Sequence, residues 1–335
     1  MVRKTLLLAG CAAFALALAG CGKKEEAPAA TPPVADASAP SGPNAAGAPA
    51  AGQGQNTGTP IDGPATLKAP ATAGAGAAIE VGWTGPGNSK DYIDLVPRGN
   101  TATSGEITYA YTHDAMPVAK LTVPTTPGDY DIRYVLDNGS TRTIKATAPI
   151  TVAAVAASLT GPAKAEGAEP FTVTWTGPAG DKDYIDIVPS TVTTPDSEVT
   201  YAWTRDGSPA KLTAPGKAGA YLVRYVQEGP TGRKILSTSP LQVSQPAATL
   251  KAPDSAAKGS KIKVEWTGPK RKNDYVDLVK KGQSETSGEL SYFYTDRAST
   301  NELNAPNDAG QYDIRYVLEA PGGRVVLATR TISVR

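Results

Sequence analysis

The sequence predicts an all-β protein in which three tandem β-sandwich domains follow a disordered tether. Three observations lead to this class. A unit of about 91 residues occurs three times, hydrophobic residues within each unit alternate with a period of two, and the segment before the first unit lacks aromatic residues. The 33 basic and 32 acidic residues give a formal net charge of +1, which does not favour nucleic acid as a partner.

The first 20 residues have the features of a secretory signal. Arg3 and Lys4 precede an apolar stretch over residues 5–20, after which the sequence becomes polar. This stretch is short for a membrane-spanning helix. We therefore expect residues 1–20 to form a signal peptide that is removed on export, with an uncleaved anchor as the alternative.

The end of the apolar stretch, Leu18-Ala19-Gly20-Cys21, resembles the lipobox of bacterial lipoproteins. The resemblance implies that Cys21 is acylated and becomes the first residue of the mature chain, so that lipid holds the protein at a membrane. In such lipoproteins an Asp after the Cys favours the inner membrane, whereas this chain has Gly22. The resemblance therefore points to the outer membrane, with the chain facing the periplasm or the cell surface.

Residues 21–64 are predicted to form a disordered tether behind the acylated Cys21. Between Gly22 and Pro64 there are fifteen Gly or Pro and eleven Ala, and the only branched aliphatic residues are Val34 and Ile61. Such a segment cannot bury enough apolar surface to offset the entropy lost on ordering. It would hold the folded part of the chain away from the bilayer.

Three copies of one domain follow the tether. Two motifs mark each copy at the same spacing, and a third, Gly-x-Tyr, precedes a segment that ends in Arg-Tyr-Val. A unit of this length suits a small domain with its own core. The expected domains are residues 65–153, 154–245 and 246–335. Trp-Thr-Gly-Pro begins at Trp83, Trp175 and Trp266, and Asp-Tyr-Ile-Asp or Asp-Tyr-Val-Asp begins at Asp91, Asp183 and Asp274.

Each copy contains about seven strand-like runs. Ile79, Val81 and Trp83 alternate with less apolar residues, which is typical of a strand with one face in water. Asp137-Asn138-Gly139-Ser140 is a hairpin signal. In the first copy we expect strands near residue 67 and at residues 79–83, 92–96, 107–112, 120–123, 130–136 and 143–152.

The repeated Trp and the Gly-x-Tyr motif resemble the core Trp and the tyrosine corner of immunoglobulin-like folds. We therefore expect three immunoglobulin-like (Ig-like) or fibronectin-III-like β-sandwiches. The combined motifs are also similar to Ig-like repeats of bacterial envelope proteins, some of which accompany a von Willebrand type A domain. This resemblance implies an envelope interaction module without catalysis. No Asp-x-Ser-x-Ser run is present, so the metal-dependent adhesion of the type A domain is not carried over.

Nine recurring polar residues are the candidate binding or structural surface. Arg133 and Asp94 are each out of phase with the core residues of their strands, and the third and sixth strands of an Ig-like sandwich are neighbours. We therefore expect them to pair on the surface, with Tyr92 alongside, either as a structural pair or as a ligand-binding patch. The full set is Tyr92, Asp94, Arg133, Tyr184, Asp186, Arg224, Tyr275, Asp277 and Arg315.

A second candidate is an aromatic strip formed by Tyr109 and Tyr111 and their equivalents, among which Trp203 replaces one Tyr. These rings either stabilise the sheet through cross-strand contacts or form a surface that contacts sugars or peptides.

The composition argues against catalysis. The chain has one His and two Cys, His113 has no equivalent in the other copies, and no zinc tetrad of the usual ligands can be assembled. We therefore expect no enzyme activity, no cofactor and no metal site. The predicted function is non-catalytic binding of an envelope protein or cell-wall glycan by a lipid-anchored rod of three Ig-like domains. The alternatives are an accessory subunit that positions an envelope enzyme or transporter, and a carbohydrate-binding lipoprotein.

Overall fold

The computed structural model describes residues 61–114 and 117–335. The expected signal peptide, the lipidation of Cys21 and nearly all of the expected tether lie outside the described residues. Within these ranges the prediction of an all-β chain is confirmed, because strands are the only regular elements apart from one 3₁₀ turn, η1 (Thr204–Asp206). No helix in these ranges is long and apolar enough to cross a membrane.

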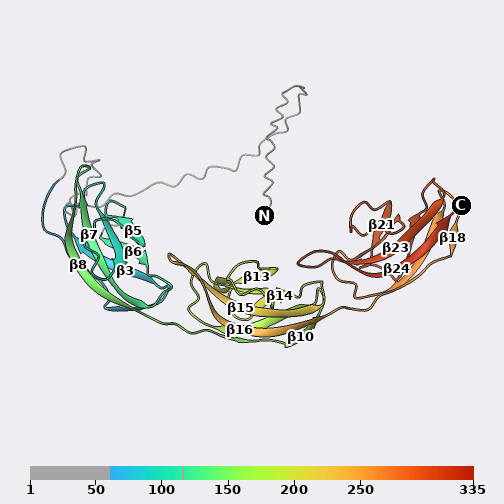
Figure 1. Cartoon of the computed structure of the whole chain (residues 1–335), viewed down its shortest axis with the longest axis horizontal. Helices are drawn as coiled ribbons and strands as arrows, with labels where there is room; N and C mark the ends of the chain where they lie inside the picture. Colours follow the sequence, from blue (N-terminus) through green and yellow to red (C-terminus); the bar gives the residue numbers. More distant parts are fainter. Residues whose placement is uncertain (1–60, 115–116) are drawn as a thin grey trace, which may run out of the picture. The chain divides into compact units, whose positions relative to one another are not determined.

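The first repeat, called module 1 here, contains eight strands (Figure 1). Seven of them correspond to the expected runs. The strands are β1 (Thr66–Lys68), β2 (Thr72–Gly74), β3 (Ala78–Thr84), β4 (Tyr92–Pro97), β5 (Thr108–Tyr111), β6 (Val118–Thr122), β7 (Gly128–Asp137) and β8 (Arg142–Ala153).

The strands of module 1 form two sheets. One has three strands in the order β1-β3-β6, and the other has five in the order β2-β8-β7-β4-β5. All pairs are antiparallel except β2 with β8, which is parallel. The strand that the sequence did not predict is β2, which has no large apolar residue, whereas β1, of the same length, has Leu67. The two sheets make a β-sandwich of the predicted Ig-like class.

Module 2 and module 3, the second and third repeats, have the same strand order in both sheets. The prediction of three tandem β-sandwiches is therefore confirmed. Module 2 contains β9 (Ser158–Thr160), β10 (Lys164–Glu166), β11 (Pro170–Thr176), β12 (Tyr184–Pro189), β13 (Thr200–Trp203), β14 (Ala210–Thr213), β15 (Gly219–Gly229) and β16 (Gly232–Ser244). Module 3 contains β17 (Thr249–Lys251), β18 (Ser255–Ala256), β19 (Lys261–Thr267), β20 (Tyr275–Lys280), β21 (Ser291–Tyr294), β22 (Thr300–Asn304), β23 (Gly310–Leu318) and β24 (Val325–Val334).

The core of each module lies between its two sheets. In module 1 the alternating residues Ile79, Val81 and Trp83 of β3 face Ile93 and Leu95 of β4, and all five are buried. This is the arrangement that the period of two predicts. The outward residues of β3 are exposed or half-buried.

The Trp-Thr-Gly-Pro and Asp-Tyr motifs meet at one end of this core. The ring of Trp83 packs 5.7 Å from that of Tyr134, centroid to centroid. The hydroxyl of Tyr134 donates a hydrogen bond to Asp91 Oδ2 over 2.8 Å and accepts one from the backbone N–H of Gly87 over 2.9 Å. Asp91 Oδ1 also accepts from the N–H of Asp137, so this buried carboxylate joins the loop after β3 to the end of β7.

The glycine of the Trp-Thr-Gly-Pro motif is required by the neighbouring tyrosine. A Cβ atom at Gly85 would lie 2.7 Å from Cε2 of Tyr134, and the corresponding distances are 2.6 Å at Gly177 and 2.5 Å at Gly268. Real Cβ contacts are not this short, and the tyrosine ring is held by its hydrogen bonds. The motif therefore has Gly at this position because the backbone passes close to the tyrosine ring.

A tyrosine corner is present in each module. The hydroxyl of Tyr130 donates to the carbonyl of Thr126 over 2.9 Å, four residues earlier in the chain. Tyr221 makes the same bond to Lys217 over 2.9 Å, and Tyr312 makes it to Asp308 over 3.0 Å. These bonds fix the turn that leads into β7, β15 and β23 and agree with the Ig-like class.

We predict that Gly85→Ala destabilises module 1 by about 1–3 kcal/mol, because the added methyl group must displace the Tyr134 ring. Gly82→Ala is the matched control three residues earlier, in β3, since its Cβ would meet only Lys68 at 3.7 Å. Hydrogen exchange of module 1 peptides in the full chain measures both effects. Equal protection in the two variants would contradict this account of the motif.

Stability should also fall at alkaline pH. Burial raises the pKa of Tyr316 from 10.0 to about 12. Because the folded-state pKa is the higher one, this stabilisation is fully present below pH 10 and is lost as the pH rises toward 12, by roughly 2–3 kcal/mol. Denaturant titrations across this range measure the fall. The stability of the Tyr316→Phe variant should fall less over this range. If its stability falls as much as that of the parent chain, Tyr316 is not the cause of the pH dependence.

Candidate functional site

The outer face of each five-stranded sheet is covered in part by the chain itself. Every residue of β4 from Tyr92 to Val96 is buried, including those that point away from the core. The cover is the loop between β4 and β5, residues 98–107, whose equivalents are residues 190–199 and 281–290. In module 1 the hydroxyl of Tyr92 donates to the carbonyl of Thr103 in this loop, over 3.2 Å.

The predicted Asp–Arg partners lie directly opposite each other on β4 and β7. Arg133 Nε donates to Asp94 Oδ1 over 3.0 Å, and Nη2 donates to Oδ2 over 2.6 Å, so the pair is bidentate. Modules 2 and 3 have the same geometry: Arg224 and Asp186 are joined over 2.9 and 2.6 Å, and Arg315 and Asp277 over 3.0 and 2.6 Å.

The expectation that these pairs lie on the surface is wrong. The exposed fraction of the side chain is 1% for Arg133 and 0% for Asp94, and the other two pairs are buried to a similar extent. The reason is the β4–β5 loop, which the alternation of residues within single strands does not reveal. An ion pair in this position loses its hydration and is stable only when its remaining hydrogen-bonding groups are satisfied.

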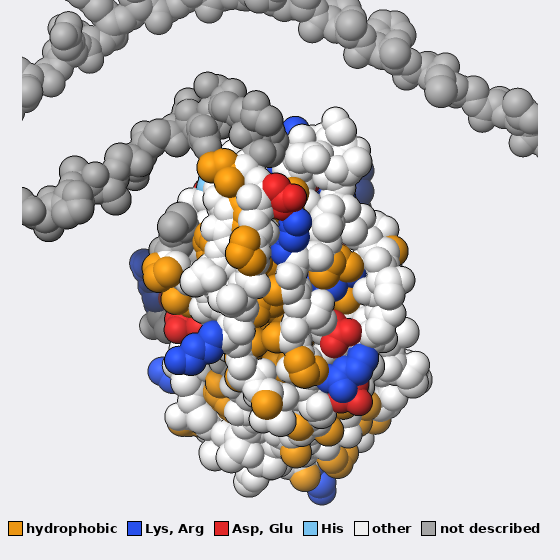
Figure 2. All heavy atoms as spheres, turned by 90° about the vertical axis from the view of Figure 1, so that its left-hand side faces the viewer, with side chains coloured by type: hydrophobic (Ala, Val, Ile, Leu, Met, Phe, Trp, Pro, Cys, Tyr) orange, Lys and Arg blue, Asp and Glu red, His pale blue; other side chains and the backbone are white. Residues whose placement is uncertain are grey.

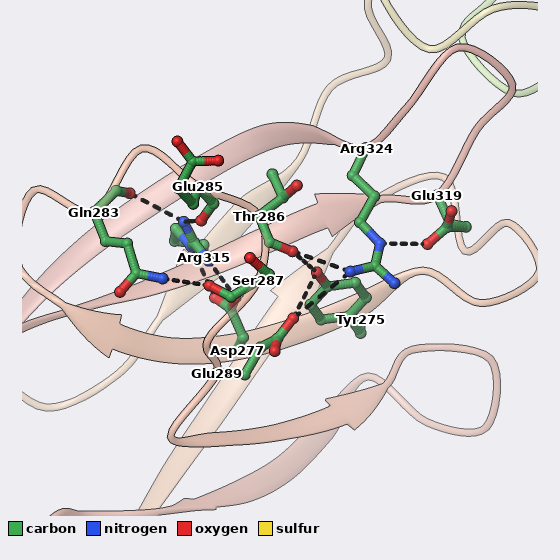
Figure 3. Close-up of polar contacts among 10 residues, drawn as sticks. All are labelled: Tyr275, Asp277, Gln283, Glu285, Thr286, Ser287, Glu289, Arg315, Glu319 and Arg324. Carbon is green, nitrogen blue, oxygen red and sulfur yellow. Dashed lines mark hydrogen bonds and ion pairs between the residues drawn. The ribbon is translucent and has the colours of Figure 1, made fainter. Parts of the chain in front are cut away.

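The loop satisfies the remaining donors of each arginine. In module 3, Arg315 Nη1 donates to the carbonyls of Gln283 over 3.0 Å and Glu285 over 2.8 Å (Figure 3). Arg133 binds two loop carbonyls in the same way, and Arg224 also binds two. The buried arginine therefore joins the loop to the sheet, and the guanidinium is not free to bind a ligand.

Burial is the main influence on the pKa of the aspartate in each pair. It raises the pKa of Asp94, Asp186 and Asp277, and the hydrogen bonds from the arginines oppose part of that increase. Hydrogen bonding to Asp94 raises the pKa of Arg133, so the guanidinium stays charged.

Beside each pair lies an open groove floored by the third predicted residue, Tyr92 or its equivalent. The guanidinium carbon of Arg142 lies 5.5 Å from the centroid of the Tyr92 ring, in a cation–π arrangement, and Arg142 Nε donates to Asp137 over 2.9 Å. Tyr109 and Tyr111 on β5 continue the aromatic surface edge to face, with centroid distances of 6.1 and 5.4 Å. Their exposed fractions are 51% and 40%.

The same residue types occur at the equivalent positions of all three modules. In module 3, Figure 3 shows Arg324 beside Tyr275, with Glu319 and Glu289 as its acidic neighbours. The grooves of modules 1 and 3 have volumes of about 620 and 520 Å³, which is the size of small-molecule sites. The groove residues, in equivalent order, are Tyr92, Glu106, Tyr109, Tyr111, Asp137 and Arg142; Tyr184, Glu198, Tyr201, Trp203, Glu228 and Arg233; and Tyr275, Glu289, Tyr292, Tyr294, Glu319 and Arg324.

Sequence analysis found the aromatic residues of this groove but missed the charged ones. Asp137 and Arg142 face each other across the β7–β8 hairpin. The signal that would have revealed them is an acidic residue five positions before an arginine in every copy, together with a glutamate at one fixed distance after the buried tyrosine.

Neither sign of charge predominates on the face that Figure 2 shows. In Figure 2, acidic and basic side chains lie next to one another on the visible face and form no large area of one sign. In the described ranges no group of three or more His, Cys, Asp or Glu residues is arranged to hold a metal ion. His113 lies in the turn after β5, where its Nε2 is 3.0 Å from Asp114.

No protein-family model matches the chain, and no curated protein matches it. Solved structures with detectable similarity include the FN1–FN3 domains of chicken CNTN1, with a TM-score of 0.22, 13% identity and coverage of 81% of this chain and 97% of that one. An I-band fragment of titin has a TM-score of 0.21, 14% identity and coverage of 82% and 99%. A marsupial T cell receptor has a TM-score of 0.23, 9% identity and coverage of 81% and 98%. At these values the similarity carries no inference about ligand or partner.

We predict that Arg224→Ala destabilises module 2 by about 3–5 kcal/mol, because it leaves Asp186 buried without its partner. Arg233→Ala is the control, since Arg233 is 36% exposed and its ion pair with Glu228 should contribute at most about 1 kcal/mol. Hydrogen exchange of module 2 peptides in the full chain measures both. If Arg224→Ala destabilises module 2 no more than the control does, the ion pair does not stabilise the module.

Proposed function

We propose that this protein is a non-catalytic, lipid-anchored binding protein of the bacterial envelope, and that its three modules bind a partner through their grooves. The observation that carries the proposal is the recurrence of the same residue types at equivalent positions in three copies, with an open groove at these positions in modules 1 and 3. The fold explains why the ion pairs and the floor tyrosines are buried. It does not explain the large exposed aromatic rings, which number two in module 1, two in module 3 and one, Tyr201, in module 2.

Tandem β-sandwich modules suit a structural or binding role. Their cores hold the sheet rigid, so the groove residues are fixed by strands rather than by mobile segments. Three copies on one chain also allow several weak contacts with a repetitive or multivalent partner to add up.

The membrane attachment in this proposal is supported by the sequence of the first 21 residues. Acylation of Cys21 would hold the chain at the outer membrane, and the Ala/Pro/Gly tether would let the modules reach a partner at some distance from the bilayer.

We predict that alanine substitution of the exposed aromatic pair in all three modules abolishes partner capture by the full-length lipoprotein, because it removes most of the apolar surface of the grooves. Lys68→Ala, on the opposite sheet of module 1, is the control and should leave capture intact. Affinity isolation from envelope extracts measures both. If an enzyme or transporter complex is recovered, the chain is an accessory subunit of that complex. If the aromatic variant captures its partner as well as the parent chain does, the grooves are not the binding site.

Cys21→Ala should move the chain from the membrane fraction to the soluble periplasmic fraction, because no lipid can then be attached. Fractionation of cells and labelling with a fatty-acid analogue measure this. Cys11→Ala is the control and should behave as the parent chain. A Cys21→Ala chain that stays in the membrane fraction would contradict lipid anchoring.

A further inference from the structure

We infer that the groove residues of each module bind a neutral saccharide. This inference rests on the proposed function and names the ligand class of the same site. It follows from three observations: the exposed aromatic faces, the arginine donors and glutamate acceptors beside them, and the balance of charge in module 1.

The aromatic faces provide an apolar surface of the right kind. Tyr109 and Tyr111 are 51% and 40% exposed, and their rings meet edge to face, so at least one ring face remains open. Sugar rings have one face lined by C–H groups, which packs on the electron-rich face of an aromatic ring. Tyr292 and Tyr294 offer the same surface in module 3, with exposed fractions of 56% and 51%.

The polar groups provide both donors and acceptors. In every module the groove arginine uses Nε to bind its acidic partner across the hairpin, and its Nη2 makes no hydrogen bond to other described residues. The carboxylates of Glu106 and Glu198 also accept no hydrogen bond from other described residues, whereas Glu289 accepts a hydrogen bond from the Tyr275 hydroxyl. A guanidinium donor and a carboxylate acceptor around one aromatic surface match a ligand whose hydroxyl groups both donate and accept.

A cationic ligand fits this groove less well. Aromatic residues with carboxylates also form sites for quaternary ammonium groups, but here the position over the floor ring is already filled. The guanidinium carbon of Arg142 lies 5.5 Å from the Tyr92 centroid, and the equivalents lie 5.7 and 5.5 Å from Tyr184 and Tyr275.

A proline-rich peptide also fits less well. Its backbone offers carbonyl acceptors but few donors, so the groove glutamate would lose water without gaining a hydrogen bond. In module 1 charge favours a neutral ligand as well, because its groove is lined by Lys90 and Arg142 against Glu106 and Asp137.

Calorimetry with the full-length chain tests the inference. The probes are neutral hexasaccharides of glucose, mannose, galactose and N-acetylglucosamine, with decaproline as the alternative ligand. We expect one of the saccharides to bind at three sites per chain. Tyr201→Ala with Trp203→Ala should reduce the number of sites to two, and Glu106→Gln should weaken the module 1 site by about tenfold or more, because one charge-assisted acceptor is lost. Lys68→Ala should change neither value.

The outcomes separate this inference from the proposed function. If no hexasaccharide binds, or if the number of sites stays at three in the module 2 variant, the saccharide assignment is wrong. Binding of decaproline that the same variant removes would overturn the saccharide assignment and leave the groove as the binding site. If the aromatic variants change neither saccharide binding nor partner capture, both proposals fail. Circular dichroism of each variant confirms that the sheet is retained.

Discussion

The structure of each module depends on one buried interaction, the bidentate ion pair between an aspartate on β4 or its equivalent and an arginine on the neighbouring strand, β7 or its equivalent. In module 1 these are Asp94 and Arg133, with exposed fractions of 0% and 1%. Removing two charges from water costs several kcal/mol per ion, so the pair needs further hydrogen bonds to the part of the guanidinium that the carboxylate does not bind. The carbonyls of the β4–β5 loop accept these hydrogen bonds, and for that reason the loop covers the sheet.

This cover also shapes the groove. The loop buries the Tyr92 side chain at its base and accepts a hydrogen bond from its hydroxyl, so the ring is fixed as a floor. The same loop ends at Glu106, which places a carboxylate on the rim. A second buried aspartate, Asp91, has a different role, because it joins the Tyr134 hydroxyl to the loop after β3 and to the end of β7. One buried acid thus stabilises the sandwich, and the other organises its outer face.

The sequence predicted the sandwich well, because alternation with a period of two depends only on neighbouring residues of one strand. It also predicted the partners Asp94 and Arg133, since their positions on adjacent strands follow from the fold class. It could not predict that they are buried, because burial depends on where a loop of ten residues lies. Strand β2 was missed because it has no large apolar residue. Arg142 was missed because its contact with Tyr92 joins β8 to β4 across the strand between them, β7. Repeats supply part of this missing information, since residues that recur at equivalent positions in three copies identify the groove without an alignment of relatives.

The most direct test of the claim that the buried pair holds the loop is hydrogen exchange of residues 190–199 in an Arg224→Lys variant of the full chain. Lysine keeps the positive charge but cannot bind Asp186 in two places and the loop carbonyls at the same time. The account predicts faster exchange in this loop, with protection of the central strands β12 and β15 retained. Unchanged exchange in residues 190–199 would contradict it.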